Sequence, residues 1–177
     1  MRQTGGEKLV GSRKESAPRS CLLVYPDSYR LGMSALGFQA VLSLVDSEPD
    51  WCAERAFAGD ERSRERGRTL SSFDLIAFSL PYELDYLNLP AVFARARLAL
   101  RSSARSASDP LVIAGGMAPT INPEPIAEFV DAVVLGEAEG PLERILALIG
   151  GRKSRPDLLR ELAAVPGVYV PALYRGT

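Results

Sequence analysis

The sequence contains no histidine among its 177 residues. Histidine is the usual general base near neutral pH, the partner of serine and cysteine nucleophiles, and a common metal ligand. Its absence excludes most hydrolase mechanisms and every histidine-ligated metal site. A reaction would therefore depend on carboxylates or on a bound cofactor, and a role in binding alone also fits.

Cysteine is scarce, and long apolar runs and excess charge are absent. Cys21 and Cys52 both fall in predicted buried strands, which favours reduced core thiols in a cytoplasmic protein over a disulfide or a metal site. No apolar run approaches the length of a membrane span, so we expect no membrane association. The net charge of -1 gives the molecule no general attraction for phosphates, so nucleic acid is not an expected partner of this chain alone.

The remaining composition is that of one globular domain, with 46% hydrophobic and 24% charged residues. Residues 1–19 are rich in glycine, serine and basic residues and have no apolar segment, so we expect a disordered leader there. We expect residues 20–151 to form the domain. Residues 152–177 would add a helix and an extended segment.

Short apolar runs at 20–25, 51–57, 74–78, 111–114 and 132–135 predict the strands of a parallel sheet, because such strands are covered on both faces. Helical patterns alternate with them, at 31–45, 84–101, 125–130, 141–149 and 156–165. The alternation predicts a three-layer α/β domain with a five-stranded parallel sheet, flavodoxin-like or Rossmann-like. We expect 51–57 to lie near the sheet edge and the charged stretch 59–68 to be a solvated loop.

Polar residues or glycines end these runs, which predicts a ligand crevice at the carboxyl edge of the sheet. Gly115-Gly116 after 111–114 would let the backbone approach a ligand closely. The glycine patterns of dinucleotide and phosphate loops are absent. Glu137 and Glu139 could act as acid and base, but acids are common at helix starts, so we assign them no catalytic role.

The segment 27–37 joins a strand to a helix and offers backbone donors to an anionic or amide-rich ligand. The structural alternative is that Asp27 caps the helix, while Gly32 and Gly37 allow tight packing of the helix on the sheet. Both interpretations remain open at this point.

Several segments in a fixed order resemble the N-terminal cobalamin (vitamin B12)-binding-type domain of a family of radical S-adenosylmethionine (radical SAM) proteins. These segments are 25–37, 54–57, 73–84, Gly115-Gly116 and 122–125. The resemblance extends over about residues 21–174. It implies a five-stranded, flavodoxin-like sheet with cobalamin over the carboxyl ends of the strands.

In cobalamin domains that bind through histidine, an Asp-x-His-x-x-Gly loop supplies the lower cobalt ligand. Residues 27–32 match this loop with Tyr29 in the place of histidine, so the resemblance implies a corrinoid held without a histidine ligand. Ser79-Leu80 would lie near its nucleotide tail and Gly115-Gly116 along the far wall. No catalytic residue or metal ligand is expected. The cofactor-binding residues implied are Asp27, Tyr29, Gly32, Met33, Ser79, Leu80, Tyr82, Gly115, Gly116, Met117, Gly136 and Glu137.

Radical SAM chemistry needs a Cys-x-x-x-Cys-x-x-Cys motif, which this chain lacks. The resemblance therefore implies that the iron–sulfur cluster and S-adenosylmethionine belong to a catalytic barrel supplied in cis or in trans. Residues 167–174 resemble the lead-in to such a barrel. The chain alone would not be an enzyme, although the whole protein could be one of methyltransferase type.

The alternative is a degenerate α/β domain that no longer binds cobalamin and serves as an interaction or substrate-docking module. Tyr29, Met33 and Tyr82 would then fill the crevice.

Overall fold

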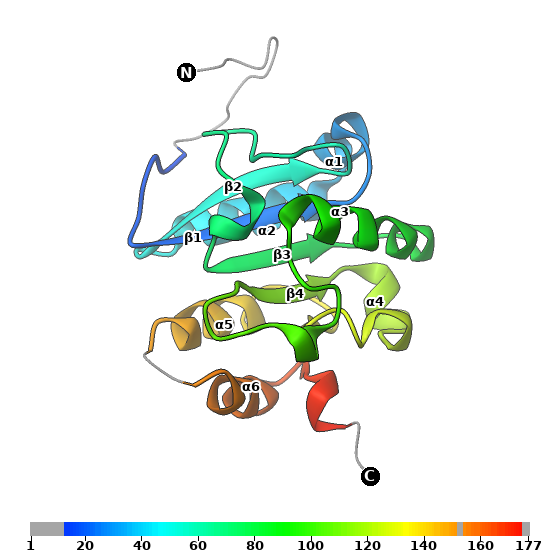
Figure 1. Ribbon diagram of the computed structural model, residues 1–177. Coiled ribbons are helices and arrows are strands. Elements are labelled where there is room, and N and C mark those ends of the chain that lie inside the picture. Colours follow the sequence, from blue (N-terminus) through cyan, green and yellow to red (C-terminus); the bar gives the residue numbers. More distant parts are fainter. Residues whose placement is uncertain (1–12, 152–153, 175–177) are drawn as a thin grey trace.

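The computed structural model describes residues 13–151 and 154–174. These residues form one six-stranded sheet with helices on both faces, in three layers (Figure 1). The strand order is β2-β1-β3-β4-β5-β6. The strands are β1 (Arg19–Tyr25), β2 (Trp51–Phe57), β3 (Leu75–Ser79), β4 (Leu111–Gly115), β5 (Ala132–Val134) and β6 (Val168–Tyr169).

The first five strands are parallel, as predicted, and their order is that of flavodoxin-like sheets. The sixth strand was not predicted. β6 pairs antiparallel with β5, with Val134 opposite Val168, so the expectation of five strands is corrected to six. Residues 168–171 were expected to be extended, but a strand of two residues is too short for any periodicity to show that it joins a sheet.

The helices of the described residues are α1 (Tyr29–Ser34), α2 (Leu36–Ser47), α3 (Leu89–Ala96), α4 (Met117–Ile121), α5 (Pro141–Ile149) and α6 (Arg155–Ala163). Shorter 3-10 turns are η1 (Leu70–Ser72), η2 (Glu83–Asn88), η3 (Ser102–Ala104), η4 (Glu124–Ile126) and η5 (Pro171–Leu173). None of these helices combines the length and the apolar character that a membrane span requires.

The core lies in two layers because successive residues of a strand point to opposite faces of the sheet. In β1, Leu23 packs in the layer of α2, α5 and α6, whereas Leu22 and Val24 pack in the layer of α3. Both faces of the central strands are therefore apolar, which is why β3, β4 and β5 appear in the sequence as uninterrupted apolar runs, whereas the edge strand β2 carries Glu54 and Arg55.

Several predicted helices differ from those in the structure. The helix expected at 31–45 is divided at Ala35, where φ is -84° and ψ is 110°. The helix expected at 84–101 is η2 followed by α3, which ends at Arg97 in the left-handed conformation, with φ of 55°. The helix expected at 125–130 is the turn η4, and α4 was not predicted. α4 has five residues and includes Pro119, so no helical periodicity marks it.

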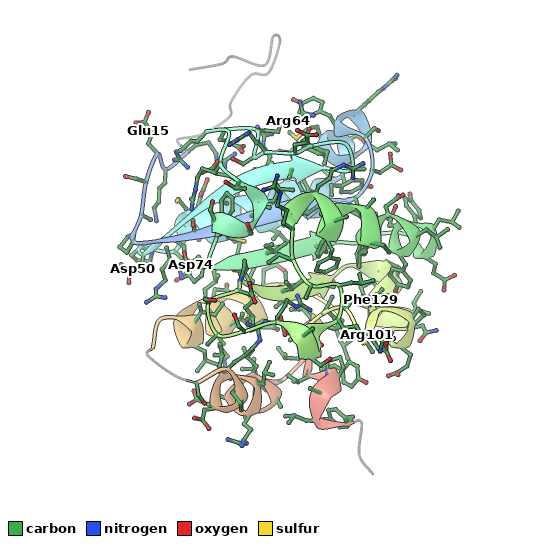
Figure 2. The ribbon with its side chains drawn as sticks, viewed as in Figure 1. Glu15, Asp50, Arg64, Asp74, Arg101 and Phe129 are labelled. Carbon is green, nitrogen blue, oxygen red and sulfur yellow. The ribbon has the colours of Figure 1, made fainter. Side chains whose placement is uncertain are left out.

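The segment 59–68 between β2 and β3 is a loop whose residues are exposed or half-buried except for Ser63, as its charges predicted, but it also makes ion pairs that the sequence did not predict. β2 is an edge strand, as expected, but its Glu54 is fully buried beneath this segment. The Glu54 carboxylate accepts hydrogen bonds from Ser63 Oγ at 2.6 Å and from Arg66 Nη1 at 2.7 Å. Arg64 (Figure 2) pairs with Asp60 at 2.5 Å. The segment therefore shields the edge of the sheet, and several of its charges, those of Asp60, Arg64, Glu65 and Arg66 among them, have specific partners.

The ends of the chain add to this packing. Of the leader predicted for 1–19, residues 1–12 lie outside the described residues. Arg13 Nη2 donates to the carbonyl oxygen of Ala53 at 2.6 Å, and Arg19 begins β1. In the segment predicted for 152–177, residues 152–153 and 175–177 lie outside the described residues, and the predicted helix is α6, which begins after Ser154.

Replacing Arg66 tests whether the buried Glu54 carboxylate depends on this partner. Arg66→Ala leaves Arg68 Nη1 3.6 Å from Glu54 Oε1 as a weaker substitute. We expect the free energy of unfolding to fall by about 2 kcal/mol, because a buried charge without its full compensation is costly. Urea unfolding measures the loss. Arg160→Ala breaks the exposed pair with Asp157 and should cost less than ~0.5 kcal/mol; equal losses for the two variants would contradict this assignment.

Candidate functional site

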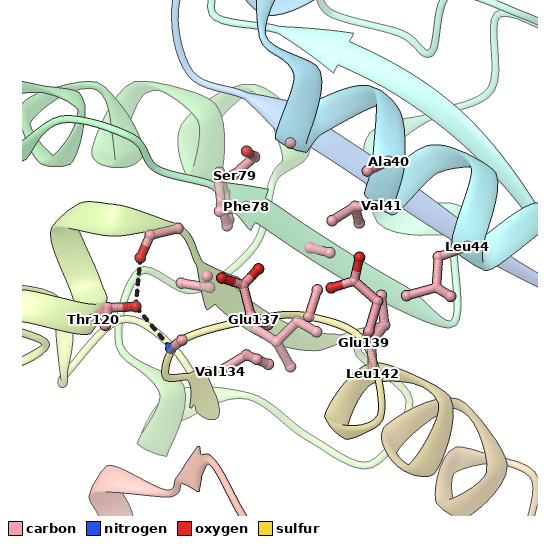
Figure 3. A pocket seen from close by; sticks show the side chains of 18 of the residues that line it. Ala40, Val41, Leu44, Phe78, Ser79, Thr120, Val134, Glu137, Glu139 and Leu142 are labelled. Carbon is pink, nitrogen blue, oxygen red and sulfur yellow. Dashed lines mark hydrogen bonds between the residues drawn. The ribbon is translucent and has the colours of Figure 1, made fainter.

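A cavity of about 380 Å³ opens at the carboxyl ends of β3, β4 and β5, between α2 and α5 (Figure 3). Its volume lies in the range of small-molecule sites. Leu23, Ala77, Ile113 and Val134 line it from the sheet. These side chains belong to the alternate strand positions that face α2 and α5, so the cavity continues the apolar layer of the core. The helices add Ala40, Val41 and Leu44 from α2 and Leu142 from α5.

Polar side chains occupy the rim of the cavity. Ser79 ends β3, and Glu137 and Glu139 lie in the loop between β5 and α5. Figure 3 shows both carboxylates directed from that loop toward the space beside α2. Thr120 Oγ1 donates to the carbonyl oxygen of Gly116 at 2.8 Å and accepts from the Gly136 amide at 2.9 Å. The rim is therefore held together by hydrogen bonds between the loops that follow β4 and β5.

The glycines at the rim have different roles. A Cβ built on Gly37 has nothing within 4 Å, so this position faces open space. Gly116 has φ of +118°, and a Cβ there would lie 2.6 Å from the carbonyl oxygen of Leu80. The Leu80 amide in turn donates to the Gly115 carbonyl oxygen at 2.8 Å. Gly116 thus permits the loop after β3 to approach the loop after β4, in addition to bordering the cavity.

Residues 27–33, which include most of α1, lie over the end of β2, outside the residues that line the cavity. Ser28 caps α1, because its Oγ accepts from the Leu31 amide at 3.4 Å; the suggested capping role of Asp27 is wrong. The Tyr29 ring packs edge-on against Phe57, with 5.1 Å between ring centroids. A Cβ on Gly32 would lie 2.5 Å from the Phe57 ring. Gly32 therefore serves tight packing of α1 on the sheet.

Half of the predicted cofactor-binding residues meet at the cavity: Ser79, Gly115, Gly116, Met117, Gly136 and Glu137. The other predicted residues do not line it: Asp27, Tyr29, Gly32, Met33, Leu80 and Tyr82. Leu80 is fully buried in the layer of α3, and the side chain of Tyr82 is 68% exposed. Tyr29, Met33 and Tyr82, which were expected to fill the crevice of a degenerate domain, leave this cavity open.

The wall that α2 contributes was missed by sequence reasoning. Gly37, Ala40, Val41 and Leu44 have the spacing of one helix face. The helical pattern at 31–45 predicted a helix but no ligand wall, because an aliphatic wall cannot be distinguished from core in a single sequence. The signal that could have been used is the pair of small residues, Gly37 and Ala40, at the start of this face.

Two ionisable groups of η2 have shifted pKa values. Burial raises the pKa of the Asp85 carboxyl; the hydrogen bond from the Tyr82 amide offsets part of this rise, and the charge of Asp27 adds to it. Burial, and then the charge of Glu83, raises the pKa of the Tyr86 hydroxyl to about 12, so this hydroxyl stays protonated near neutral pH. Both groups belong to η2, outside the cavity. Among the described residues, no three metal-ligating side chains are grouped as a metal-ion site.

The model of the family described as "Radical SAM proteins, N-terminal" matches residues 37–171, which is more than half of the chain. The chain belongs to this radical SAM N-terminal family. The predicted membership of a radical SAM family is thereby confirmed, while the family description does not mention cobalamin. The match includes α2, α5 and the loops at the cavity rim, and it begins after the loop 27–33.

A curated relative of this radical SAM N-terminal domain is the uncharacterized protein MJ0966 of Methanocaldococcus jannaschii. The two are 26% identical over 122 residues, which cover 69% of this chain and 24% of the relative. The chain thus spans about a quarter of the length of the curated relative that it matches. No solved structure matches the chain significantly.

Alanine substitutions separate the roles of the two adjacent glycines. Gly116→Ala places a Cβ against the Leu80 backbone and requires a left-handed conformation, so we expect a loss of ~3 kcal/mol or more in the free energy of unfolding. Gly115→Ala meets Val134 Cβ at an ordinary 3.6 Å and should cost less than ~1 kcal/mol. Chemical denaturation of both variants measures the difference, and a tolerated Gly116→Ala would show that the close approach is dispensable.

Proposed function

We propose that this radical SAM N-terminal domain binds a corrinoid cofactor and presents it to a radical SAM catalytic domain. The observation that carries the proposal is the open cavity between α2, α5 and the carboxyl ends of β3, β4 and β5. The resemblance to cobalamin-binding-type domains leads us to expect a nucleotide tail entering the sheet beside a Gly-Gly loop. Gly115-Gly116 borders this cavity.

The residues present fit such a tail. The sheet side of the cavity is aliphatic and would pack against an aromatic base through Leu23, Ile113 and Val134, with burial of apolar area as the driving force. Ser79 at the rim carries a hydroxyl that can donate or accept a hydrogen bond. The open space at Gly37 leaves the entrance beside α2 unobstructed.

The described residues offer cobalt no histidine, and the ring of Tyr29 is packed against Phe57 instead of lining the cavity. A corrinoid held here would therefore be bound through its tail and ring edges. Bound in this way, the corrinoid would supply methyl transfer or tuning of a radical step. The chain's own residues would bind and orient it, while S-adenosylmethionine and the iron–sulfur cluster act in the catalytic domain.

Exposed apolar side chains support docking of a partner at the same end of the sheet. They are carried by α1, the start of α2, η2 and α4: Leu31, Leu36, Tyr82, Leu84, Leu87, Met117 and Ile121. Hydrogen bonds from Tyr86 Oη to Asn122 O at 3.0 Å and from Asn88 Nδ2 to Pro26 O at 2.8 Å connect these segments. Clustered apolar surface is typical of interaction sites. The occupant that we propose is the radical SAM catalytic domain.

The exposed apolar side chains at this end of the sheet also favour the alternative function. A domain that had lost its cofactor could still use the same surface as an interaction module for its catalytic domain. Corrinoid binding distinguishes the two functions, because a docking module would retain the apolar end without retaining the ligand.

Binding of hydroxocobalamin tests the proposal directly. The chain is mixed with hydroxocobalamin and passed through a gel-filtration column, and the visible spectrum of the protein fraction is recorded. We expect close to one corrinoid per chain. If all of the corrinoid elutes in the small-molecule fraction at high micromolar protein, corrinoid binding is rejected. The docking module is then the remaining function.

A substitution at the entrance locates the bound ligand. Gly37→Leu fills open space beside α2 and, as a leucine in a helix, should not reduce stability. We expect corrinoid affinity to fall at least ~10-fold, because overpacking a site costs on the order of 1–3 kcal/mol. Gly59→Leu is the matched control: its Cβ also meets nothing within 4 Å, but Gly59 lies outside the cavity lining. Equal affinity in both variants would place the ligand elsewhere.

A further inference from the structure

Charge is distributed unevenly over this molecule. Exposed acids gather beyond the carboxyl ends of the strands, where Glu83, Glu137 and Glu139 lie. Arginines gather instead beside α3, which covers the face of the sheet opposite α2 and α5 (Figure 1). The net charge of -1 therefore conceals a basic surface, which we name the arginine face: Arg62, Arg66, Arg68, Arg95 and Arg97. We infer that the arginine face binds the phosphate backbone of a nucleic acid.

The arginine face is formed where the segment between β2 and β3 packs against α3. η1 contacts α3, and the Arg95 guanidinium of α3 donates to the carbonyl oxygen of Ala58. Arg62 forms an isolated antiparallel bridge with Thr69, which folds the segment back on itself and brings Arg62 near Arg68. None of the arginines of this face lines the cavity, so the inference is independent of corrinoid binding.

Carboxylates balance only part of the charge of the arginine face. Glu54 Oε1 lies 2.7 Å from Arg66 Nη1 and 3.6 Å from Arg68 Nη1, so a single buried carboxylate serves two guanidinium groups. Glu61 is a second carboxylate in this segment, and it is exposed. The other acids of the segment are Asp60, which pairs with Arg64, and Glu65, which pairs with Arg55; neither partner belongs to the arginine face.

The remaining arginines of the face make no ion pair with a carboxylate among the residues that the structure describes: Arg62, Arg95 and Arg97. Arg62 Nη1 donates to the carbonyl oxygen of Gly67 at 2.9 Å, as Arg95 does to that of Ala58. A neutral carbonyl oxygen fixes the direction of a guanidinium group without cancelling its charge. Positive charge is therefore in excess on this face and partly pre-oriented.

Arg97 is held in an unusual conformation. It ends α3 with φ of 55° and is the only residue other than glycine with a positive φ in the described part of the chain. Glycine is the usual residue at such a helix end, because a Cβ is strained there. The Arg97 side chain is exposed, so packing does not compensate for this strain. A use of its charge by a ligand would account for an arginine at this position.

The chemistry of the face favours a nucleic acid over a protein or a membrane. Every cation of the face is an arginine, whose guanidinium fork matches phosphate oxygens. The exposed large hydrophobic residues of the described chain lie outside α3 and outside the segment 58–72. A protein interface needs an apolar core and a membrane surface takes up apolar side chains, which this face does not offer. Contacts of guanidinium groups with phosphates would position a nucleic acid without reading its sequence.

Fluorescence anisotropy with a labelled oligoribonucleotide, and with the oligodeoxyribonucleotide of the same sequence, tests the inference. We expect binding at low salt, and a plot of log affinity against log salt concentration with a slope of about -2 to -3, because each neutralised phosphate contributes about -0.7. A difference between the two affinities would identify which nucleic acid is the partner, and equal affinities would show that the backbone alone is recognised.

Two results would overturn the inference while leaving corrinoid binding untouched. One is the absence of binding to both oligonucleotides at low salt. The other is tighter binding to phosphatidylglycerol vesicles or to polyglutamate than to either oligonucleotide, since the face would then serve a membrane or an acidic protein.

Replacing Arg97 separates loss of binding from loss of the fold. Arg97→Gly removes the charge and relieves the strain, so the urea midpoint should rise while the affinity for the oligonucleotide falls about fivefold. Arg97→Lys keeps the charge and should retain most of the affinity. Arg144→Gln is the matched control, because it removes an exposed positive charge from α5 on the opposite face. It should change the affinity less than ~twofold. Equal losses in Arg97→Gly and Arg144→Gln would overturn the assignment to the arginine face.

Discussion

The cavity exists because α2 and α5, two of the three helices that cover one face of the sheet, are anchored at opposite sides of it. α2 follows β1 and packs beside β2, and α5 follows β5, whereas α3 follows β3 and covers the other face. Phe38 and Leu142 fix α2 and α5 in one apolar layer. Near the carboxyl ends of β3 and β4 this layer contains glycine and alanine on the facing surface of α2. The connectivity of the sheet and these small residues together leave a space that the core does not fill.

The sheet could be predicted from the sequence because burial on both faces leaves a direct signature. Leu111 to Ala114 is apolar throughout, and the same holds for residues 21–25 of β1 and for β5. The structural features that were not predicted from the sequence are those set by single interactions. The break at Ala35 and the left-handed end of α3 at Arg97 do not alter apolar periodicity, and β6 has only two residues. The charged segment after β2 is the loop that was predicted, but its ion pairs were not foreseen because Glu54, which neutralises Arg66, lies twelve residues away on a strand.

The candidate site could be predicted in part, and for a similar reason. Ser79, Gly115 and Gly136 end strands, and strand ends of a parallel sheet meet at one edge, so their proximity follows from the fold class. The side chains that give the cavity its apolar surface are not marked by any motif in the sequence. Val41 and Leu142 are ordinary aliphatic residues, and their role depends on the distance between two helices. The segment 27–32 shows the opposite case. It resembles a binding loop, with Tyr29 in the place of histidine, but Tyr29 and Gly32 pack α1 on Phe57.

A binding site built in this way has shape and apolar surface but few directional groups. In the function that we propose, it would hold an apolar part of a corrinoid, with reactivity supplied elsewhere in the protein. The most direct measurement is a crystal structure of the chain grown with hydroxocobalamin. Our account predicts density for the tail base between α2 and α5, against Ile113 and Val134, with no side chain of this chain on cobalt. A corrinoid bound at another surface, or an empty cavity at saturating ligand, would contradict it.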